Sequence, residues 1–385
     1  MKNLLYICLL MGVFASCTPK ENMLGPDVIA IDNPIRDLDS TDAIFKRRSE
    51  GYFCFRIPAI VKTKEGTLLA FAEARKNNCS DEDDIDLVLK RSTDGGKTWG
   101  PLMVVWSDGN NTCGNPSPIV DQVTGRVVLL MTWNLGTDKI GTINDGTSTD
   151  TRRVFITYST DDGLNWDAPK EITNDVKKPE WGWYATGPVH GLQIQSGPHK
   201  NRMVIPCDYI ELRRNGGKGF SHVIYSDDLG DTWHIGGISP NERANESTVA
   251  ELSDGRLMLN MRATGRNARW VAESEDAGLS WKNMRTDYNL VEPVCQGSLL
   301  DAYVNGQHTL FFSNPASTAR ENMTIKMSTN NGSSWDKYVR IHAGPSAYSD
   351  IVMINDQTVG ILYEGGIANP YETITFREVP VTLFK

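Results

Sequence analysis

One arginine interrupts an apolar run near the start of the chain. The stretch CFRIPAIV (54–61) has the composition of a buried strand, and Arg56 stands within it. Removing a charge from water without a partner is costly, so buried charges are nearly always paired or functional. Arg56 therefore indicates either a structural acid as its partner or an anion that the protein binds.

Three further stretches carry polar groups where a strand should be apolar or where a loop leaves a sheet. They are FAEARKNNCSDEDDIDL (71–87), NESTVAELSDGRLMLNMRATGR (245–266) and the region from SNPASTAR (313–320) to SAYSDIVMI (346–354). Between them they supply arginines, carboxylates and a tyrosine. Such groups can hold an anion and move protons.

An octapeptide recurs between these stretches. Its five copies, S-x-D-x-G-x-x-W with one Asp replaced by Asn330, are STDGGKTW (92–99), STDDGLNW (159–166), SDDLGDTW (226–233), SEDAGLSW (274–281) and STNNGSSW (328–335). Each copy follows a short strand-like run. Ser and Asp side chains bond to nearby backbone amides, Gly supplies a positive φ, and Trp returns to the sheet. The octapeptide therefore predicts a turn and no catalytic group.

The spacing of the octapeptides predicts the architecture. The repeats begin 67, 67, 48 and 54 residues apart, which fits one four-stranded sheet per repeat. Without a leader of about 45 residues, the chain divides into six units of about 57 residues. We expect an all-β domain over 43–385, a six-bladed β-propeller, in which the strand AIF (43–45) closes the ring beside ITFREVP (374–380).

Taken together, the motifs resemble those of the exo-α-sialidases (neuraminidases) of the bacterial Asp-box type. FRIP, the repeated boxes, EAR followed six residues later by an aspartate, NE-x-x-V-x-E-L and AYSD occur in that family's order. The resemblance covers essentially the whole chain after the leader. It implies a sialidase-like six-bladed β-propeller whose active site lies at the centre of the ring, on the face opposite the boxes.

The resemblance also implies roles for seven residues. The substrate carboxylate is gripped by three arginines, a further arginine contacts the O4 region of the sugar, and the nucleophile, its basic partner and the acid/base complete the set. The three arginines on the carboxylate are Arg56, Arg262 and Arg320, and the further arginine is Arg75. The nucleophile is Tyr348, its basic partner is Glu246 and the acid/base is Asp81. The implied enzyme is a retaining glycoside hydrolase that releases terminal α-ketosidically linked sialic acid through a tyrosyl intermediate, without a cofactor or a metal.

These residue types suit that chemistry. Sialic acid bears a carboxylate on its anomeric carbon, and guanidinium groups offer paired donors that stay charged at any working pH. The same carboxylate would repel an Asp or Glu nucleophile at bonding distance. A tyrosine is neutral until it attacks, and a glutamate can take its proton. The resemblance to sialidases, which use a tyrosine nucleophile, implies this role for Tyr348.

Several alternatives remain open at this point. Glu251 competes with Glu246, and Asp83 or Asp84 could replace Asp81 as the acid. We expect Arg266 and Arg269 at the surface, and the cluster WGWY (181–184) could line the site or the core. A non-catalytic sialoglycan-binding propeller, acting as a lectin or adhesin, would keep the boxes. An intramolecular or trans-sialidase variant would keep every residue named.

Composition narrows the partners. With 385 residues, 39% hydrophobic residues and a formal net charge of −9 from interspersed charges, the chain is globular and not built for nucleic acid. The expected partners are sialylated glycans, glycoproteins and glycolipids. We expect a monomer that meets a membrane only through an N-terminal lipid anchor.

The first residues read as an export signal. A lysine, an apolar stretch and small residues precede Cys17 in MKNLLYICLLMGVFASC. This pattern predicts a signal peptide (1–16), lipidation of Cys17 in a lipobox-like FASC, and a tether (17–42). The protein is then expected as an exported bacterial lipoprotein of the periplasm or cell surface, anchored in the outer membrane. Its ordinary alternative is a cleaved signal and a released protein.

The remaining cysteines cannot all pair. After Cys8 and Cys17 five are left, so at most two disulfides form: Cys54, Cys79, Cys113, Cys207 and Cys295. Their spacing shows no zinc motif. The sequence does not assign the pairs.

Overall fold

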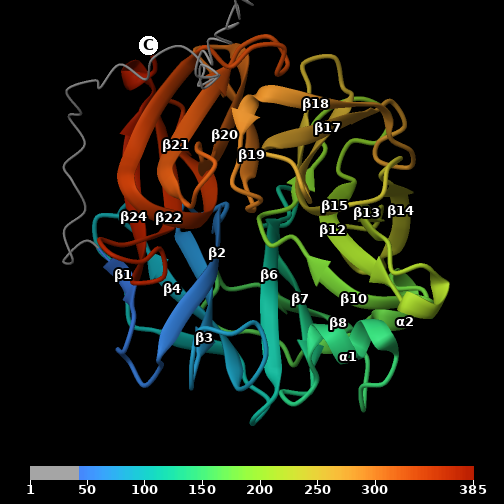
Figure 1. Cartoon of the computed structure of the whole chain (residues 1–385). Helices are drawn as coiled ribbons and strands as arrows, with labels where there is room; N and C mark the ends of the chain where they lie inside the picture. The colour runs from blue at the N-terminus through green and yellow to red at the C-terminus, as the bar shows by residue number, and fades with distance from the viewer. Residues whose placement is uncertain (1–42) are drawn as a thin grey trace, which may run out of the picture. The chain divides into compact units, whose positions relative to one another are not determined.

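The computed structural model describes residues 43–385, and the predicted leader, Cys17 and the tether lie outside this range. The described chain is almost entirely β-sheet, which confirms the all-β prediction. Its strand pairings form four sheets, two of which continue from one four-stranded antiparallel unit into the next, so that six such units follow one another along the described chain. Figure 1 shows these units following one another around a centre, from blue through green and yellow to red.

Three units come from the first part of the chain. The first holds β2 (Cys54–Lys62), β3 (Leu68–Arg75), β4 (Ile85–Ser92) and β5 (Met103–Trp106). The second holds β6 (Thr112–Val120), β7 (Val127–Asn134), β8 (Arg153–Ser159) and β9 (Lys170–Glu171). The third holds β10 (Trp181–Thr186), β12 (Met203–Glu211), β13 (Gly219–Ser226) and β14 (His234–Ile238), with β11 (Leu192–Gln193) beside β12.

Three more units follow. The fourth holds β15 (Ala244–Glu251), β16 (Leu257–Ala263), β17 (Ala268–Ser274) and β18 (Lys282–Val291). The fifth holds β19 (Ser298–Val304), β20 (Gln307–Pro315), β21 (Glu321–Ser328) and the first part of β22 (Lys337–Asn355). The sixth joins the second part of β22 to β23 (Thr358–Gly365), β24 (Thr373–Pro380) and β1 (Ala43–Lys46).

The ends of the described chain meet in the sixth unit. β1 pairs antiparallel with β24, with Ala43 opposite Thr375. The predicted closure of the ring by residues 43–45 is therefore confirmed. It covers one edge of a sheet that would otherwise be open to pairing with another chain.

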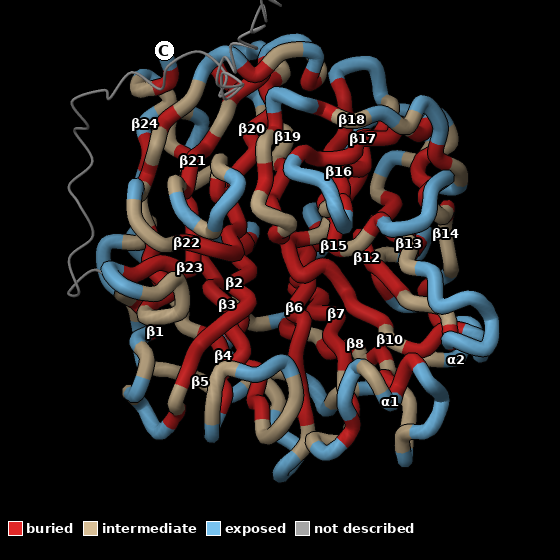
Figure 2. The backbone as a smooth tube through the Cα atoms, in the orientation of Figure 1, coloured by how far each residue is buried: buried red, intermediate tan, exposed pale blue. Residues whose placement is uncertain are grey.

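Each unit packs against the next through its own apolar cluster. The six clusters lie one at each boundary between neighbouring units, including the boundary between the sixth unit and the first. Inner strands are therefore buried on both faces, which explains why β2 and β3 are near-continuous apolar runs. Outer strands such as β9 are exposed. Figure 2 shows this gradient from buried strands to exposed loops.

A buried carboxylate ties the units together at the centre. Asp350 accepts hydrogen bonds from the backbone N of Ile60 (2.9 Å), from the hydroxyl of Ser298 (2.7 Å) and from the His190 ring, whose Nδ1 lies 2.6 Å away. These groups come from three other parts of the ring. Asp350, the last residue of AYSD, therefore has a structural place.

The few helices lie outside the sheets. They are α1 (Ile140–Asp145), α2 (Thr173–Val176) and the short 3₁₀ turns η2 (Arg213–Asn215) and η3 (Val381–Leu383). Within residues 43–385, no helix has the length and apolar character needed to cross a lipid bilayer.

The octapeptides form the predicted turns. In the first, the Ser92 hydroxyl donates to Asp94 (2.8 Å) and accepts from Gly96 N (2.8 Å), while Asp94 accepts from Thr98 N (2.9 Å). The other four repeat this pattern, and Asn330 takes the place of the aspartate, accepting from Ser334 N at 3.0 Å. The boxes are therefore structural turns.

Candidate active site

The predicted site residues lie at the ends of the strands away from the octapeptide turns. In the first unit Cys54 pairs with Arg75 at one end, whereas Leu68 pairs with Ser92, the start of the box, at the other. In the fourth unit Ala244 pairs with Ala263 at one end and Leu257 with Ser274 at the other. Antiparallel pairing thus sends turns and site residues to opposite faces.

A tyrosine and a glutamate from different units form the centre of the site. The Tyr348 hydroxyl, on β22, donates to Glu246 Oε1 on β15 at 2.5 Å. Arg262 Nη1 lies 2.7 Å from Glu246 Oε2 and 3.1 Å from the Tyr348 hydroxyl. Burial and the neighbouring Glu246 hold the pKa of Tyr348 well above its ordinary value, so the phenol is protonated with a base in contact.

The three predicted arginines surround this tyrosine. Arg262 contacts its hydroxyl, and the guanidinium carbons of Arg56 and Arg320 lie 5.2 Å and 5.7 Å from the centre of its ring. The three come from β2, β16 and the loop before β21, far apart in the chain. Three fixed cations therefore converge on one side chain.

Arg56 has a structural partner that the sequence did not reveal. Glu364, on β23 and fully buried, accepts from Arg56 Nε at 2.9 Å and from Arg56 Nη2 at 3.3 Å. The same carboxylate accepts from the backbone N of Ile57 (2.9 Å) and of Tyr348 (3.1 Å). Glu364 thus fixes an arginine and the strand of the tyrosine together. A lone buried Glu in an apolar strand was its only signal.

Tyr371 is a second residue that sequence reasoning missed. It lies in the loop between β23 and β24, its hydroxyl accepts from Arg320 Nη1 at 2.6 Å, and the Arg56 guanidinium lies 4.1 Å from its ring centre. A tyrosine in a polar loop carries no pattern that predicts such a place. It orients two of the three arginines.

The acidic loop places Asp81 beside two of the predicted arginines. Arg75 is buried between Glu73 and Asp81, with Nη2 2.5 Å from Glu73 Oε2 and 2.9 Å from Asp81 Oδ1. Arg56 Nη1 lies 3.6 Å from the same Asp81 oxygen. Although burial raises it, Arg75 and Arg56 together hold the pKa of Asp81 below its usual range. The Asp81 side chain is 67% exposed, so a ligand can reach it.

The alternatives to these residues have other partners. Asp83 accepts from the side-chain amides of Asn77 and Asn78 (3.2 and 3.1 Å) and shapes its own loop. Glu251 lies at the far end of β15, where it accepts from Gln195 N (2.6 Å) and the hydroxyl of Ser196. Neither contacts the tyrosine–arginine cluster in the structure.

One surface prediction is wrong. Arg266 is exposed as expected, but Arg269 is fully buried and pairs with the equally buried Glu292 at 2.8 Å. Its guanidinium also donates to the Cys295 carbonyl (2.8 Å). Arg269 lies on β17, and the neighbouring unit covers it. The polar residues beside it in the sequence therefore did not indicate that it is exposed.

The WGWY cluster belongs mainly to the core. Trp181 is buried and stacks on Tyr209, with ring centres 3.7 Å apart and planes at 8°. Trp183 is half-buried and carries the Arg152 guanidinium 3.9 Å from its ring. The structure places no contact between these rings and Tyr348 or Glu246 among the described residues.

One disulfide forms, between Cys54 and Cys79, and Cys113, Cys207 and Cys295 are free and buried. Among residues 43–385, no group of three or more His, Cys, Asp or Glu side chains is placed to hold a metal ion.

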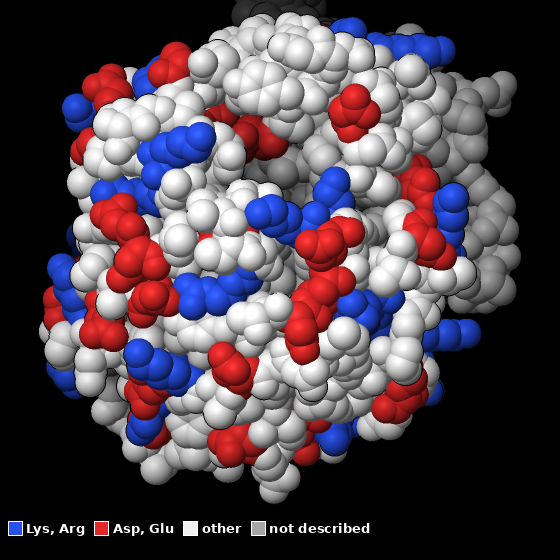
Figure 3. Space-filling view, turned by 180° about the vertical axis from the view of Figure 1, so that it is seen from behind, with Lys and Arg blue, Asp and Glu red and all other residues white. Residues whose placement is uncertain are grey.

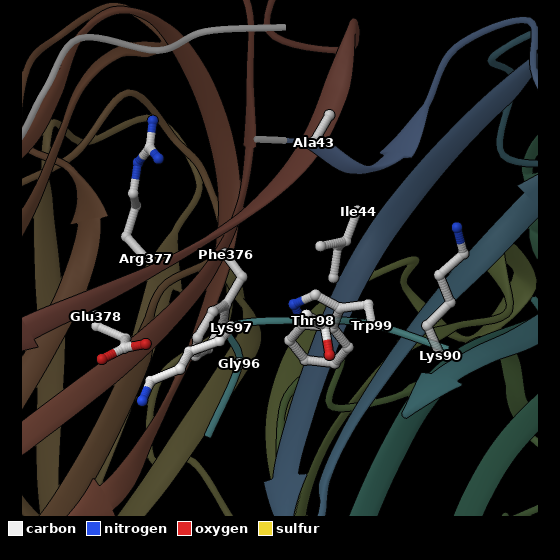
Figure 4. Close-up of a pocket in the computed structure, with 10 residues that line it drawn as sticks. All are labelled: Ala43, Ile44, Lys90, Gly96, Lys97, Thr98, Trp99, Phe376, Arg377 and Glu378. Atoms are coloured by element: carbon white, nitrogen blue, oxygen red, sulfur yellow. The ribbon is translucent and has the colours of Figure 1, made fainter. Parts of the chain in front are cut away.

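A separate pocket of about 500 Å³ lies at the first octapeptide turn (Figure 4). Lys90, Lys97, Trp99 and Phe376 are among its lining residues. None of the predicted site residues lines it, and it lies at the turn end of the first unit. It is therefore distinct from the cluster around Tyr348.

Comparisons with known proteins agree with this geometry. The BNR repeat-like domain family matches residues 66–361. A sialidase of Bacteroides fragilis is 34% identical over 347 residues, covering 84% of this chain and 62% of that protein. An exo-alpha-sialidase of Aspergillus fumigatus is 30% identical over 83% of this chain and 80% of its own length. The chain belongs to the sialidase family.

Solved structures of this family share the fold. The Hadza microbial sialidase Hz136 has a TM-score of 0.81 at 31% identity, covering 89% of this chain and 69% of that one. The intramolecular trans-sialidase from Ruminococcus gnavus has a TM-score of 0.76 at 19% identity, a likeness of fold alone. The chain spans 62% and 51% of the lengths of the sialidases of B. fragilis and Micromonospora viridifaciens.

Proposed function

We propose that this protein is a retaining exo-α-sialidase that releases terminal sialic acid from glycans, glycoproteins and glycolipids. One observation carries the proposal: three guanidinium groups surround a protonated tyrosine that already donates to a glutamate. A bound acid with its carboxylate on the reacting carbon would satisfy the arginines and bring that carbon to the phenol. Membership of the sialidase family supports this substrate class.

The first displacement uses the Tyr348–Glu246 pair. As the Tyr348 oxygen bonds to the anomeric carbon, its proton passes to Glu246 Oε1, 2.5 Å away in the resting protein. Asp81 gives its proton to the glycosidic oxygen, and the bond to the leaving alcohol breaks. The product of this step is a glycosyl-tyrosine and a free alcohol.

The second displacement reverses these roles. Asp81, now a carboxylate, takes a proton from water as the water oxygen attacks the anomeric carbon. The bond to Tyr348 breaks and the phenol regains its proton from Glu246. Two inversions give net retention, so the sugar leaves as the α-anomer.

The charge around Asp81 suits a switch between acid and base. In the resting protein Arg75 and Arg56 favour its carboxylate form. A substrate carboxylate beside Arg56 offsets part of that positive charge, and the leaving group shields Asp81 from water; both effects raise the pKa of Asp81. Substrate binding therefore promotes the acid form that the first step needs.

The decisive test is to incubate the protein with an aryl α-sialoside and follow the products by NMR. We expect free α-sialic acid as the first product, before mutarotation. An anhydro sugar would instead assign the protein to intramolecular trans-sialidases. Binding without turnover would favour the lectin or adhesin alternative.

We also propose that the protein is exported to an oxidising compartment. The Cys54–Cys79 disulfide supports this, because such bonds persist mainly outside the reducing cytosol. Lipidation of Cys17, anchoring in the outer membrane and the monomeric state remain predictions. Mass spectrometry of the mature N-terminus tests the lipid.

A further inference from the structure

Asp81 sits near the tip of a loop whose base and tip are held differently. The loop, residues 76–84, joins β3 to β4, and each of its residues is at least partly exposed. At its base Lys76 N donates to the carbonyl of Asp84 (3.0 Å), and the amides of Asn77 and Asn78 donate to Asp83. These hydrogen bonds join the two ends of the loop to each other.

The tip is joined to the neighbouring strand by a covalent bond. Cys79, two residues before Asp81, is bonded to Cys54 on β2, with Cα atoms 5.4 Å apart. Cys54 is fully buried and pairs with Arg75 across β2 and β3. Arg75 Nη1 in turn donates to the Cys79 carbonyl at 2.5 Å. The tip is therefore fixed to the strand that carries Arg56.

One residue of the loop has an unusual backbone conformation. Asp83 has a φ of 107°, a backbone region that residues other than glycine rarely adopt. The Asp81 side chain is 67% exposed, so packing alone does not immobilise it. Its two ionic contacts, to Arg75 and Arg56, form only while the tip stays beside β2.

We propose that the Cys54–Cys79 disulfide is a positioning element for general acid catalysis: it holds the Asp81 carboxyl where it can protonate the leaving oxygen. This inference rests on the proposed sialidase function. A displacement of about 1 Å in a catalytic group can cost roughly a hundredfold in rate. The disulfide is two residues from Asp81 and limits how far its carboxyl can move from the leaving oxygen. Tyr348, Glu246 and Arg262 lie on other strands, so the disulfide does not position them.

The proposal predicts a loss that depends on the leaving group. A nitrophenolate leaves without much help from an acid. The hydroxyl of a neighbouring sugar is a much poorer leaving group, and its oxygen must be protonated as the bond breaks. A misplaced Asp81 therefore slows cleavage of a sugar sialoside, in which sialic acid is linked to another sugar, far more than cleavage of a nitrophenyl sialoside. A bridge that merely stabilises the fold would slow both substrates alike, or neither.

The test uses the full chain with Cys54 and Cys79 both changed to Ser, which leaves no unpaired thiol at this place. We expect kcat/KM to fall about tenfold to a hundredfold for the sugar sialoside and less than about threefold for the nitrophenyl sialoside. Adding Asp81→Asn to the double variant should cause a smaller further loss than Asp81→Asn causes in the wild type. That non-additivity marks the two as one unit.

Reduction of the wild type gives an independent route to the same state. Dithiothreitol should open the bond, as alkylation of Cys54 and Cys79 followed by mass spectrometry reports, and reproduce the leaving-group pattern. The Cys54→Ser/Cys79→Ser variant with dithiothreitol is the matched control and should not change further. A thermal melt shows whether each sample is folded.

Three results would overturn the proposal. Equal losses on both substrates by a folded variant would assign the disulfide to the Arg56 strand or to general stability. No loss on either substrate would mean that hydrogen bonds alone hold the loop. If the wild type cleaves neither sialoside, the proposed function fails, and this inference fails with it.

Discussion

The two ends of the same strands in this propeller are built in opposite ways. At the turn end, the hydrogen bonds that shape each octapeptide join residues at most four positions apart, as those of Asp94 with Ser92 and Thr98 do. At the site end, Tyr348 and Glu246 are 102 residues apart, and Arg56 and Glu364 are 308 apart. One end is local and repeated, whereas the other exists only when the ring has closed.

The two ends also differ in how their charged side chains are compensated. At the turns, the aspartate at the third position of the octapeptide accepts from hydroxyl and backbone amide donors of its own turn, whereas other turn aspartates pair with arginines. At the site, arginines and carboxylates from different units pair with one another in a buried cluster, as Arg56 does with Glu364 and Arg262 with Glu246. Surface charge elsewhere is mixed, with acidic and basic side chains interspersed over one face (Figure 3). The arginine cluster is therefore a local arrangement within an acidic protein. Changes at the site should cost activity, and changes at the turns should cost stability.

The largest effect is expected for Tyr348→Phe. This change removes the attacking oxygen but leaves the three arginines, so kcat should fall by about a thousandfold or more while sialic acid still binds. Steady-state kinetics with an aryl α-sialoside and calorimetric titration with sialic acid measure the two quantities. Tyr288→Phe, at a tyrosine that is 76% exposed, is the matched control. Near wild-type kcat in Tyr348→Phe would refute the nucleophile assignment.

A smaller effect is expected for Arg320→Ala. Two arginines still hold the carboxylate, so KM should rise about tenfold to a hundredfold while kcat changes less. The exposed Arg266→Ala variant should behave as wild type. Initial-rate measurements over a range of sialoside concentrations separate the two parameters. A loss confined to kcat would show that Arg320 acts on the transition state and not on binding.

The pH profile tests the switch at Asp81. Because Arg75 and Arg56 lower the pKa of Asp81 in the free protein although burial raises it, the alkaline limb of kcat/KM should lie at low pH. Bound substrate raises that pKa, so the limb of kcat should lie at a higher pH than the limb of kcat/KM. Rates measured from about pH 2.5 to 8, with a check that the protein stays folded, cover the low-pH limb of kcat/KM as well as the limb of kcat. Coincident limbs would contradict a substrate-linked shift.

The smallest effect concerns the turns. Asp276 accepts from Ser274, Ser280 N and the Ser280 hydroxyl, so Asp276→Ala should lower the free energy of unfolding by about 1–2 kcal/mol without changing kcat. Asp276→Asn should cost less, since Asn330 serves the fifth turn naturally. Urea unfolding measures the change. Loss of kcat with unchanged stability would break the distinction between the two ends.

The same carboxylate gives a pH signature. Although burial raises it, hydrogen bonds from Ser280 and Ser274 hold the pKa of Asp276 below its usual value. The folded protein thus binds fewer protons there than the unfolded chain. The stability advantage of wild type over Asp276→Asn should exist above about pH 4 and disappear as pH falls through the folded pKa. Unfolding curves at pH 3 and pH 7 compare the two.

Much of the fold could be predicted because its determinants are local. The octapeptides carry their own hydrogen-bond partners, and their spacing sets the size of each four-stranded unit. Motif order also predicted that Arg56, Arg262 and Arg320 lie with Tyr348 and Glu246. Arg269 was misplaced because its burial depends on Glu292, which reaches it from beyond the next strand. A pattern of neighbours along the chain does not contain that contact.

The turns and the all-β character can be read from the amino-acid sequence, because each depends on side chains within a few positions. Three contacts emerge only in the folded chain: Glu364 with Arg56, Tyr371 with two arginines, and Cys54 with Cys79. Burial and charge compensation arise from groups that become neighbours only when the six four-stranded units pack around one centre.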